Sequence, residues 1–245
     1  MPTAIITGAS RGLGFENAKG LAALGYDIVM IAKDQSRLSL AQQSLQRHHP
    51  DQHFTTYAVD LEDQVATRST VELIAQQQPT AEIMILAHGV MSEKMSKTLK
   101  TTDAEWRRVM SINLDSVFTL VNGLAPAMVE ARNGRVIIYS ACLGRMSGPG
   151  NAGGLAPYRI SKAGVNALVR NLAHETGMGA RGLLVDAICP NHSRTDMGGP
   201  DAPRSAEEGA ETALWLLNRP FNPQSENEIE KTTGVLWEDH QIVPW

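Results

Sequence analysis

Short apolar runs alternate along this chain with longer stretches whose apolar positions recur at helical spacing. Each run is bounded by glycine, proline or polar residues, a pattern typical of strands that are buried on both faces. The predicted strands are residues 4–7, 28–32, 54–59, 83–87, 136–140 and 183–189, of which 54–59 has the weakest pattern. Because parallel strands need crossover connections, this alternation predicts an α/β fold, a doubly wound parallel sheet with helices on both faces.

Helix starts and connection lengths complete this outline. Thr102 and Ser205 are each followed three residues later by a Glu, the spacing of a capping box, and a helix over 15–24 follows the first strand. No linker or repeat divides residues 1–245, so one domain is expected. Two stretches, 144–157 and 191–204, are too long for tight turns and are predicted to form walls of a substrate pocket.

Composition and charge exclude several classes of protein. Of the 245 residues, 42% are hydrophobic and 20% charged, and the 22 Lys and Arg are outnumbered by 26 Asp and Glu, which disfavours a nucleic acid partner. No apolar run approaches the roughly 18 residues of a membrane span and no secretion signal is recognised, so we expect a cytoplasmic protein without a membrane partner. Cys142 and Cys189 lie far apart without ligand spacing, so neither a disulfide nor a metal site is predicted.

A glycine-rich loop lies between the first predicted strand and the first helix. It reads Thr7-Gly8-Ala9-Ser10-Arg11-Gly12-Leu13-Gly14. Glycines permit a tight turn and a close backbone approach, and the helix N-terminus offers free N–H groups to a pyrophosphate. The alternative is a glycine turn without a ligand. The position in the first βα turn favours a dinucleotide site instead.

Tyr158 and Lys162 are four residues apart in a predicted helix, so their side chains project from one face. An ammonium beside a phenol stabilises the phenolate and lowers its pKa from about 10, which makes the tyrosine a usable proton donor. Such a pair also occurs by chance on many helices. Together with the glycine loop it indicates a catalytic role.

The spacing Thr-Gly-x-x-x-Gly-x-Gly, with Tyr158-Arg159-Ile160-Ser161-Lys162, resembles the short-chain dehydrogenase/reductase family in its single-domain branch, whose sheet is of the Rossmann type. The ending, from 233–235 to 243–245, is similar to a carbonyl-reductase-like subgroup. The resemblance implies that Tyr158 is the general acid, that Lys162 lowers its pKa and binds ribose, and that Asn113 holds a relay water. It also implies a homodimer or homotetramer.

The same resemblance implies a set of cofactor-binding residues along the carboxyl ends of the strands. Asp60 and Leu61 match an adenine-contacting pair, and Pro190 to Thr195 matches a nicotinamide loop. The full implied set is Gly8, Ser10, Arg11, Gly12, Leu13, Gly14, Lys33, Asp60, Leu61, Ala87, Gly89, Asn113, Tyr158, Lys162, Pro190, Ser193 and Thr195. Further residues expected to line the pocket are Met91, Leu143, Met146, His192, Met197 and Trp237.

Three positions depart from the family pattern. The family serine, counted from Gly134, falls on Ala141, and Ser140 one residue earlier faces the other side of a strand, so it is a doubtful catalytic candidate unless a bulge turns it. His88 replaces a small residue near the ribose; a locally satisfied histidine is favoured over a proton-transfer role. Asn191 replaces a glycine of the nicotinamide loop, and asparagine tolerates the left-handed conformation that such a turn needs.

Charges near the second strand bear on the choice of cofactor. By the resemblance, Ala32 occupies the position where NAD-preferring enzymes place an acidic residue. Lys33 and Arg11 supply cations for a 2′-phosphate, so NADP(H) is the predicted cofactor; the alternative is that both are solvated surface charges. Asp34 is expected to face solvent or to begin the next helix.

These features predict an oxidoreductase that transfers a hydride between NADP(H) and a ketone or aldehyde, or the corresponding alcohol, with Tyr158 as proton donor. The alternative is a catalytically weak NADP-binding sensor or scaffold, suggested by Ala141, His88 and Asn191 together. A halohydrin-dehalogenase-like function is disfavoured because the glycine loop is intact and Lys162 is present. The expected partner is a small carbonyl or alcohol, which the sequence does not identify.

Overall fold

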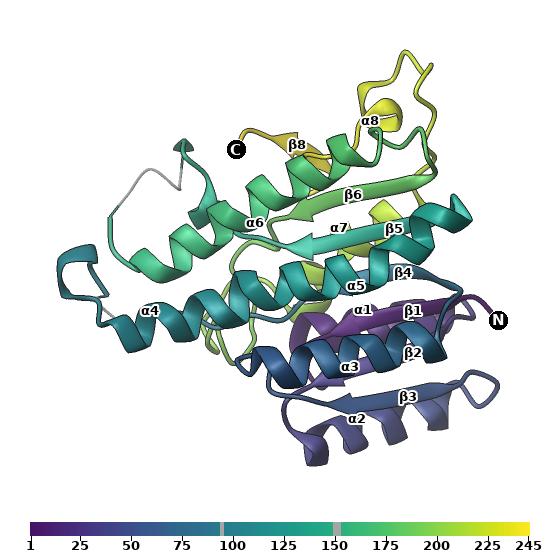
Figure 1. Ribbon diagram of the computed structural model, residues 1–245, viewed down its shortest axis with the longest axis horizontal. Coiled ribbons are helices and arrows are strands. Elements are labelled where there is room, and N and C mark those ends of the chain that lie inside the picture. Colours follow the sequence, from purple (N-terminus) through teal and green to yellow (C-terminus); the bar gives the residue numbers. More distant parts are fainter. Residues whose placement is uncertain (94–95, 149–152) are drawn as a thin grey trace.

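The computed structural model describes residues 1–93, 96–148 and 153–245, and contains an eight-stranded sheet in the order β3-β2-β1-β4-β5-β6-β7-β8 (Figure 1). The strands are β1 (Thr3–Thr7), β2 (Asp27–Ala32), β3 (Phe54–Ala58), β4 (Ala81–Leu86), β5 (Gly134–Tyr139), β6 (Leu183–Ile188), β7 (Leu236–Glu238) and β8 (Gln241–Val243). The ladders from β3 to β7 are parallel, and β8 pairs with β7 in the antiparallel sense. The predicted doubly wound parallel sheet is confirmed.

Helices cover both faces of this sheet. One face carries α1 (Gly12–Ala23), α2 (Gln35–His48) and α7 (Ala206–Asn218), and the other carries α3 (Gln64–Gln77), α5 (Ser116–Ala131) and α6 (Ala156–Glu175) (Figure 1). The described residues also form α4 (Asp103–Met110), α8 (Glu228–Lys231), short 3-10 turns at Thr98–Lys100 and Cys142–Gly144, and a π-helical turn at Ser111–Asp115.

The two apolar cores follow from strand alternation. In β5, Val136 and Ile138 pack with α5 and α6, whereas Ile137 and Tyr139 point to the opposite face and pack with α1 and α7. All four are buried. Strands covered on both faces are apolar at most positions, which is why they read as nearly continuous hydrophobic runs in the sequence, although β6 also buries Asp186.

The helix-capping predictions hold at one site in full and at the other in part. Helix α7 begins with a complete capping box between Ser205 and Glu208. At α4, Thr102 accepts a hydrogen bond from the backbone N–H of Glu105. The Glu105 carboxylate does not return this bond, because it pairs with Arg108 at 2.8 Å and accepts the backbone N–H of Glu93.

The six predicted strands lie within two residues of the observed ones, but β7 and β8 were not predicted. Each has only three residues, too few for a period to show. Of the predicted loop 144–157, residues 149–152 lie outside the described part of the chain. The loop 191–204 connects β6 to α7 as expected.

The expectation for the two cysteines was wrong. Cys142 and Cys189 are 47 residues apart in sequence, yet their Cα atoms lie 5.7 Å apart and their sulfur atoms form a disulfide. The physical reason is strand order: Cys142 follows β5, Cys189 follows β6, and these neighbouring parallel strands end at the same edge of the sheet. Sequence separation therefore hides their proximity.

One helical stretch of the described residues, 103–131, has the length and apolar composition of a membrane span, with half of its most apolar window buried. It contains α5, whose buried residues belong to the core against the sheet. A core helix passes the same test of length and composition.

Candidate active site

The candidate site lies where the strand order reverses, between β1 and β4. Crevices at such switch points, beyond the carboxyl ends of the strands, are the usual ligand sites of doubly wound sheets. The glycine loop between β1 and α1 forms one wall. A Cβ on Gly14 would lie 2.4 Å from the Gly8 carbonyl oxygen, and one on Gly8 would lie 3.2 Å from the Ala87 backbone. The close fit between strand, loop and helix therefore requires these glycines.

This cradle fits the pyrophosphate of a dinucleotide. Gly8 and Gly12 have φ values of +67° and +55°, which turn the backbone sharply before α1. No side chain caps the N-terminus of α1 within the described residues, so its N–H groups are available to an anion. Ser10 and Arg11 lie in this loop, and Leu13 lies in the first turn of the helix.

Helix α6 brings Lys162 next to Gly89, which follows β4, and Tyr158 lies one turn earlier on the same helix. Both side chains are buried, and the Lys162 Nζ lies 6.0 Å from the centre of the Tyr158 ring. Nζ donates a hydrogen bond of 2.7 Å to the backbone carbonyl of Tyr139 at the end of β5. The Tyr158 backbone N–H donates to the Ser92 hydroxyl at 2.8 Å, which fixes the start of α6.

The pKa values of this pair differ from the sequence-based expectation. Burial raises the pKa of Tyr158 to about 12, and burial lowers the pKa of Lys162 to about 8. The expected lowering of the phenol pKa by the ammonium is therefore not found here, because desolvation of the phenolate outweighs a charge 6.0 Å from the ring. At neutral pH the arrangement holds a neutral phenol beside a lysine that is still charged.

Asn113 holds the loop after β4 against α6. It lies in the π-helical turn, where its Oδ1 accepts the backbone N–H of Val90 at 2.8 Å. Its Nδ2 donates to the Val90 carbonyl at 2.9 Å and to the Ser161 hydroxyl at 3.1 Å. A Cβ on Gly89 would lie 3.4 Å from Asn113 Oδ1 and 3.5 Å from Lys162 Nζ, so Gly89 lies directly beside both groups. Such π turns are frequent at functional sites.

Ser140 is held against α6 by its own hydrogen bonds. Its hydroxyl lies 2.5 Å from Asn166 Oδ1 and 3.3 Å from the Lys162 carbonyl, so it is bound to the inner side of α6. No bulge turns it, because the β5–β6 register runs unbroken to Tyr139 and Ser140 N–H still bonds to Ile188. Ala141 comes next, with an extended backbone and a half-buried side chain. The position of the family serine is therefore held by a methyl group.

His88 is part of a closed chain of hydrogen bonds. Its Nδ1 lies 2.6 Å from Thr7 Oγ1 and its Nε2 lies 2.8 Å from Ser116 Oγ. Thr7 Oγ1 already accepts the Ala87 N–H, and Ser116 donates to the Ile112 carbonyl at 2.7 Å. Only the neutral Nε2–H tautomer satisfies every partner: Thr7 donates to Nδ1, and Nε2–H donates to Ser116. This geometry is that of a locally satisfied histidine.

The neutral form of His88 predicts a pH-dependent stability. Burial, together with the Lys162 charge, lowers the pKa of His88 to about 3. Between that value and the unfolded value of 6.5, the unfolded chain binds a proton that the folded chain does not, so stability is lost as pH falls below 6.5. We expect His88 to account for a loss of about 2 kcal/mol in unfolding free energy between about pH 7.5 and 5, measured by urea denaturation.

Two variants serve as controls, and the unfolding free energy of each is measured over the same pH range. His88→Ala should be less stable than the wild type at about pH 7.5 by roughly 2–4 kcal/mol, because Thr7 and Ser116 lose their partner, but should lose less on acidification. His48→Ala, on the exposed face of α2, should keep the wild-type pH dependence. An unchanged acid slope in His88→Ala would contradict the assignment.

Charged side chains at the ends of β1, β2 and β3 are already paired. Lys33 Nζ lies 2.6 Å from Asp60, and Arg11 pairs with Asp196 in the loop after β6. Arg37 in α2 lies 3.6 Å from the same Asp196 carboxylate, so two guanidinium groups converge on one point. Arg37 is not among the residues predicted from the sequence. Asp34 begins α2 as predicted, because its side chain accepts the Arg37 backbone N–H at 2.9 Å. The position of Arg37 in the first turn of that helix could have indicated that it lies near the glycine loop.

The loop after β6 closes over the glycine loop. Asn191 has a φ of +57°, so the turn expected after Pro190 is retained without glycine. A Cβ on Gly12 would lie 3.1 Å from the Thr195 methyl group. The Ser193 hydroxyl is buried and donates to the Pro190 carbonyl at 3.0 Å. His192 is exposed, with its Nε2 2.8 Å from the Gly198 carbonyl.

Two other expectations concern residues outside this corner. Asp60 and Leu61 follow β3 as predicted, with Leu61 buried. Trp237 was expected to line the pocket, which is wrong: it is fully buried in the core and its indole N–H donates to Asp186 at 3.0 Å. Its place in the unpredicted strand β7 explains the error.

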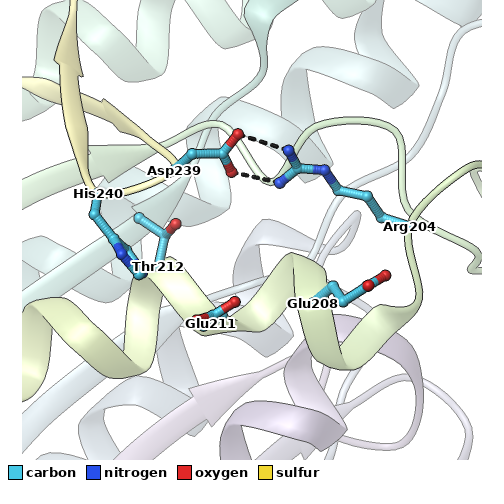
Figure 2. A pocket seen from close by; sticks show the side chains of 6 residues that line it. All are labelled: Arg204, Glu208, Glu211, Thr212, Asp239 and His240. Atoms are coloured by element: carbon cyan, nitrogen blue, oxygen red, sulfur yellow. Dashed lines mark hydrogen bonds and ion pairs between the residues drawn. The ribbon is translucent and has the colours of Figure 1, made fainter.

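A polar cavity of about 320 Å³ lies on another part of the surface, between α7 and the β7–β8 turn (Figure 2). Six residues line it: Arg204, Glu208, Glu211, Thr212, Asp239 and His240. Figure 2 shows Arg204 and Asp239 joined by two hydrogen bonds at its upper rim. Tyr158 and Lys162 are not among its lining residues, so this cavity is separate from the candidate site.

Comparison with known proteins decides the family. The family model described as short chain dehydrogenase matches residues 2–205, which span every strand from β1 to β6 and both residues of the Tyr158–Lys162 pair. This chain belongs to the short-chain dehydrogenase family. The matched range includes the glycine loop, Asn113 and the Tyr158–Lys162 pair of α6.

Individual relatives cover most of the chain. The 3-oxoacyl-acyl-carrier-protein reductase of Pseudomonas aeruginosa is 32% identical over 238 residues, covering 96% of this chain and 90% of that protein. Gluconate 5-dehydrogenase of Gluconobacter oxydans is 28% identical over 194 residues, covering 79% and 72%. The structure of a short-chain dehydrogenase from Sphingobium yanoikuyae in complex with NADPH superposes with a TM-score of 0.78 at 24% identity, covering 89% and 85%.

Proposed function

We propose that this short-chain dehydrogenase is an NADP(H)-dependent oxidoreductase that reduces a ketone or aldehyde, or oxidises the corresponding alcohol. The observation that carries the proposal is the buried Tyr158–Lys162 pair, which lies beside Gly89 and Asn113 at the switch point of the sheet. The relatives are consistent with it, since 3-oxoacyl reductases and gluconate 5-dehydrogenases both act on a carbonyl/alcohol pair. The carbonyl-reductase-like subgroup is a finer part of the same proposal.

In this mechanism bound NADPH supplies the hydride for the carbonyl carbon. Tyr158, with a pKa of about 12, is fully protonated at neutral pH and donates its phenol proton to the carbonyl oxygen. Lys162 gives one of its three N–H donors to Tyr139, which leaves donors for the ribose and a positive charge near the phenolate that forms. We place the relay water at Asn113 Oδ1, which keeps acceptor capacity beside its bond from Val90.

The cofactor residues of the proposal surround this centre. The glycine loop would bind the pyrophosphate, Asp60 and Leu61 the adenine, and Lys33 and Arg11 the 2′-phosphate. Ala87 and Gly89 would lie along the ribose, and Pro190, Ser193 and Thr195 along the nicotinamide. Ser140, bound to Asn166, is not proposed as a catalytic group.

The missing serine hydroxyl predicts a gain of activity on restoring it. Ala141→Ser would place a donor at the end of β5, where the family polarises the substrate carbonyl. One such donor is worth about 2.7–4 kcal/mol, so we expect kcat to rise by about 10²-fold for carbonyl reduction. Ser140→Ala is the matched variant, and should change kcat by less than about twofold even if its lost bond to Asn166 lowers stability.

A loss of activity in Ser140→Ala with folding and NADPH affinity unchanged would show that Ser140 reaches the substrate after all. No gain in Ala141→Ser would show that another group already fills the role. Both are read from steady-state NADPH oxidation and from fluorescence titration with NADPH.

A catalytically weak NADP-binding sensor or scaffold is the second candidate function. The observation that favours it is the methyl group of Ala141 in place of a hydroxyl donor. A panel of ketones and aldehydes, assayed with NADPH beside fluorescence measurements of NADPH affinity, separates the two. Turnover of any carbonyl supports the reductase, whereas tight NADPH binding without turnover supports the sensor.

We further propose one catalytic domain over residues 1–245, acting in the cytoplasm as a homodimer or homotetramer. Symmetric self-association is common among soluble enzymes, and Phe118 on α5 is an apolar side chain that is 51% exposed. Sedimentation of the purified protein tests the oligomeric state.

A further inference from the structure

Two cysteines flank the candidate active site. Cys142 directly follows Ala141 and begins the 3-10 turn after β5, while Cys189 directly follows β6 and precedes Pro190. Their sulfur atoms are bonded, with Cα atoms 5.7 Å apart, and the Cys142 backbone N–H lies 3.0 Å from the Cys189 sulfur. This Cα separation lies within the usual disulfide range. Each cysteine thus begins one of the two loops that border the site.

We propose that Cys142 and Cys189 form a reversible thiol–disulfide site that controls turnover, with the disulfide form as the active one. The proposal rests on the reductase function above. The bond closes a segment of 47 residues that contains the whole of α6, and so both Tyr158 and Lys162. It also fixes the backbone next to Ala141 against the start of the loop that holds Asn191. Opening it would loosen the two loops where the carbonyl must be placed.

The surroundings of the bond extend this link to the C-terminal hairpin. The Cys142 sulfur lies 3.5 Å from a Glu238 carboxylate oxygen and 3.7 Å from Asn191 Oδ1. Glu238 in turn lies 3.8 Å from Arg145, three residues beyond Cys142. Asn191 donates to Asp239 at 3.3 Å. The disulfide is therefore the covalent centre of a polar network that joins the loops after β5, β6 and β7.

Exposure of the two sulfur-bearing residues sets the order of exchange. Cys189 is buried at 2% exposure, whereas Cys142 is only half-buried, so an external thiol or disulfide reaches Cys142 first. In oxidation, the Cys142 thiolate attacks a low-molecular-weight disulfide, RSSR, and releases RSH. The Cys189 thiolate then attacks the Cys142 sulfur of the mixed disulfide and releases the second RSH. Each protein thiol loses its proton before it attacks, and the RS⁻ that leaves takes up that proton, so the protein loses two protons and two electrons and RSSR gains both as two RSH.

The same side chains could also be considered as ligands of a metal ion. Cys142, Cys189 and Glu238 each offer a ligand atom, and these atoms lie within 4.8 Å of one another. A divalent metal would need both sulfurs as separate thiolates, and in this structure they are bonded to each other. The experiment below therefore also measures whether the purified protein contains a bound metal.

The experiment compares the whole enzyme equilibrated with glutathione disulfide and with dithiothreitol. The chain has only two cysteines, so thiol counting in denaturant should find none in the first form and two in the second. Reduction should lower Tm by about 8–16 °C, because the closed segment is long. It should lower kcat/KM for the carbonyl by about tenfold, since small displacements at a reacting centre have large effects. NADPH affinity should fall by less than kcat/KM does, because the glycine loop lies on other strands and only the nicotinamide loop follows Cys189.

Cys142→Ala separates the bond from general effects of thiol reagents. It should have the activity and Tm of the reduced wild type and should respond to neither reagent. Cys142→Ser is the second variant if the first folds poorly. Cys142 is substituted and not Cys189 because Cys142 is the more exposed residue, so the packing of the buried Cys189 is unchanged.

Four results would overturn the proposal in different ways. Two free thiols after treatment with glutathione disulfide would show that the bond does not form. One equivalent of bound metal in the purified protein, with both thiols reduced, would show a metal site instead. Equal kcat/KM in both forms would show a structural disulfide and leave the reductase function standing. No turnover in either form, with the expected thiol counts and Tm shift, would overturn the proposed function and the control of turnover but not the redox bond.

Discussion

Replacing Tyr158 with Phe is expected to lower kcat for carbonyl reduction by about 10²–10⁴-fold, the usual contribution of a positioned general acid. The variant removes only the phenol oxygen. The ring stays buried in the same place, and the backbone bond to Ser92 that begins α6 is unaffected. NADPH affinity should therefore remain within about twofold of the wild-type value, as measured by fluorescence titration.

The matched control for this variant is Tyr57→Phe. Tyr57 lies in β3 and its hydroxyl bonds to Gln77, away from the crevice, so its loss should leave kcat unchanged. Retention of more than about a tenth of wild-type kcat in Tyr158→Phe would show that another group supplies the proton. A parallel fall in NADPH affinity would show instead that the phenol acts mainly in binding.

The fold was predictable because its strands have a distinctive pattern of apolar residues that can be recognised over a few positions. Strands covered on both faces are apolar at most positions, so β1, β2, β4, β5 and β6 appear as nearly continuous hydrophobic runs. The glycine loop was predictable for a related reason: Gly14 faces the Gly8 carbonyl so closely that no side chain fits. Strands β7 and β8 carry too few residues for such a pattern, and Trp237 was misplaced with them.

Features that depend on distance in space were not predictable in the same way. The Cys142–Cys189 bond needs the order of strands, which one sequence does not state. The pKa of Tyr158 depends on how deeply its phenol is buried and on how far it lies from the Lys162 charge. The four-residue spacing on the helix predicts the nearby charge but not the burial. Alternation along a strand, by contrast, places Ser140 on the face of Val136 and Ile138, where its hydroxyl bonds to Asn166 of α6.

The cofactor preference depends on a pairing that only the structure shows. Arg11 and Arg37 both lie against Asp196, although they come from the glycine loop and from α2. A carboxylate held by two guanidinium groups marks a place that suits a phosphate, because planar guanidinium donors bind both anions in the same way. Ala32 ends β2 without a carboxylate, although Asp34 two residues later also lies 3.7 Å from Arg37. We therefore expect the 2′-phosphate of NADPH to take the position of the Asp196 carboxylate.

If the 2′-phosphate replaces the Asp196 carboxylate, substitution of an arginine should lower kcat/KM for NADPH and substitution of Asp196 should raise it. Both arginine side chains are about half exposed, so solvent weakens each contact, and Arg11→Ala or Arg37→Ala should lower kcat/KM for NADPH by about tenfold with little change for NADH. Asp196→Asn removes the competing charge and should raise the preference for NADPH by about threefold or more. Lys33→Ala should have the smallest effect, because Lys33 is already bound to Asp60 at 2.6 Å.

The measurement is the ratio of kcat/KM for NADPH and NADH in the wild type and in these four variants. The Asp196 variant is the sharpest of them, because it predicts a gain that general damage to the fold does not produce. Equal use of both cofactors by the wild type would show that no 2′-phosphate site exists here. A loss of NADPH preference in Asp196→Asn would show that this carboxylate positions the arginines for the cofactor and does not compete with it.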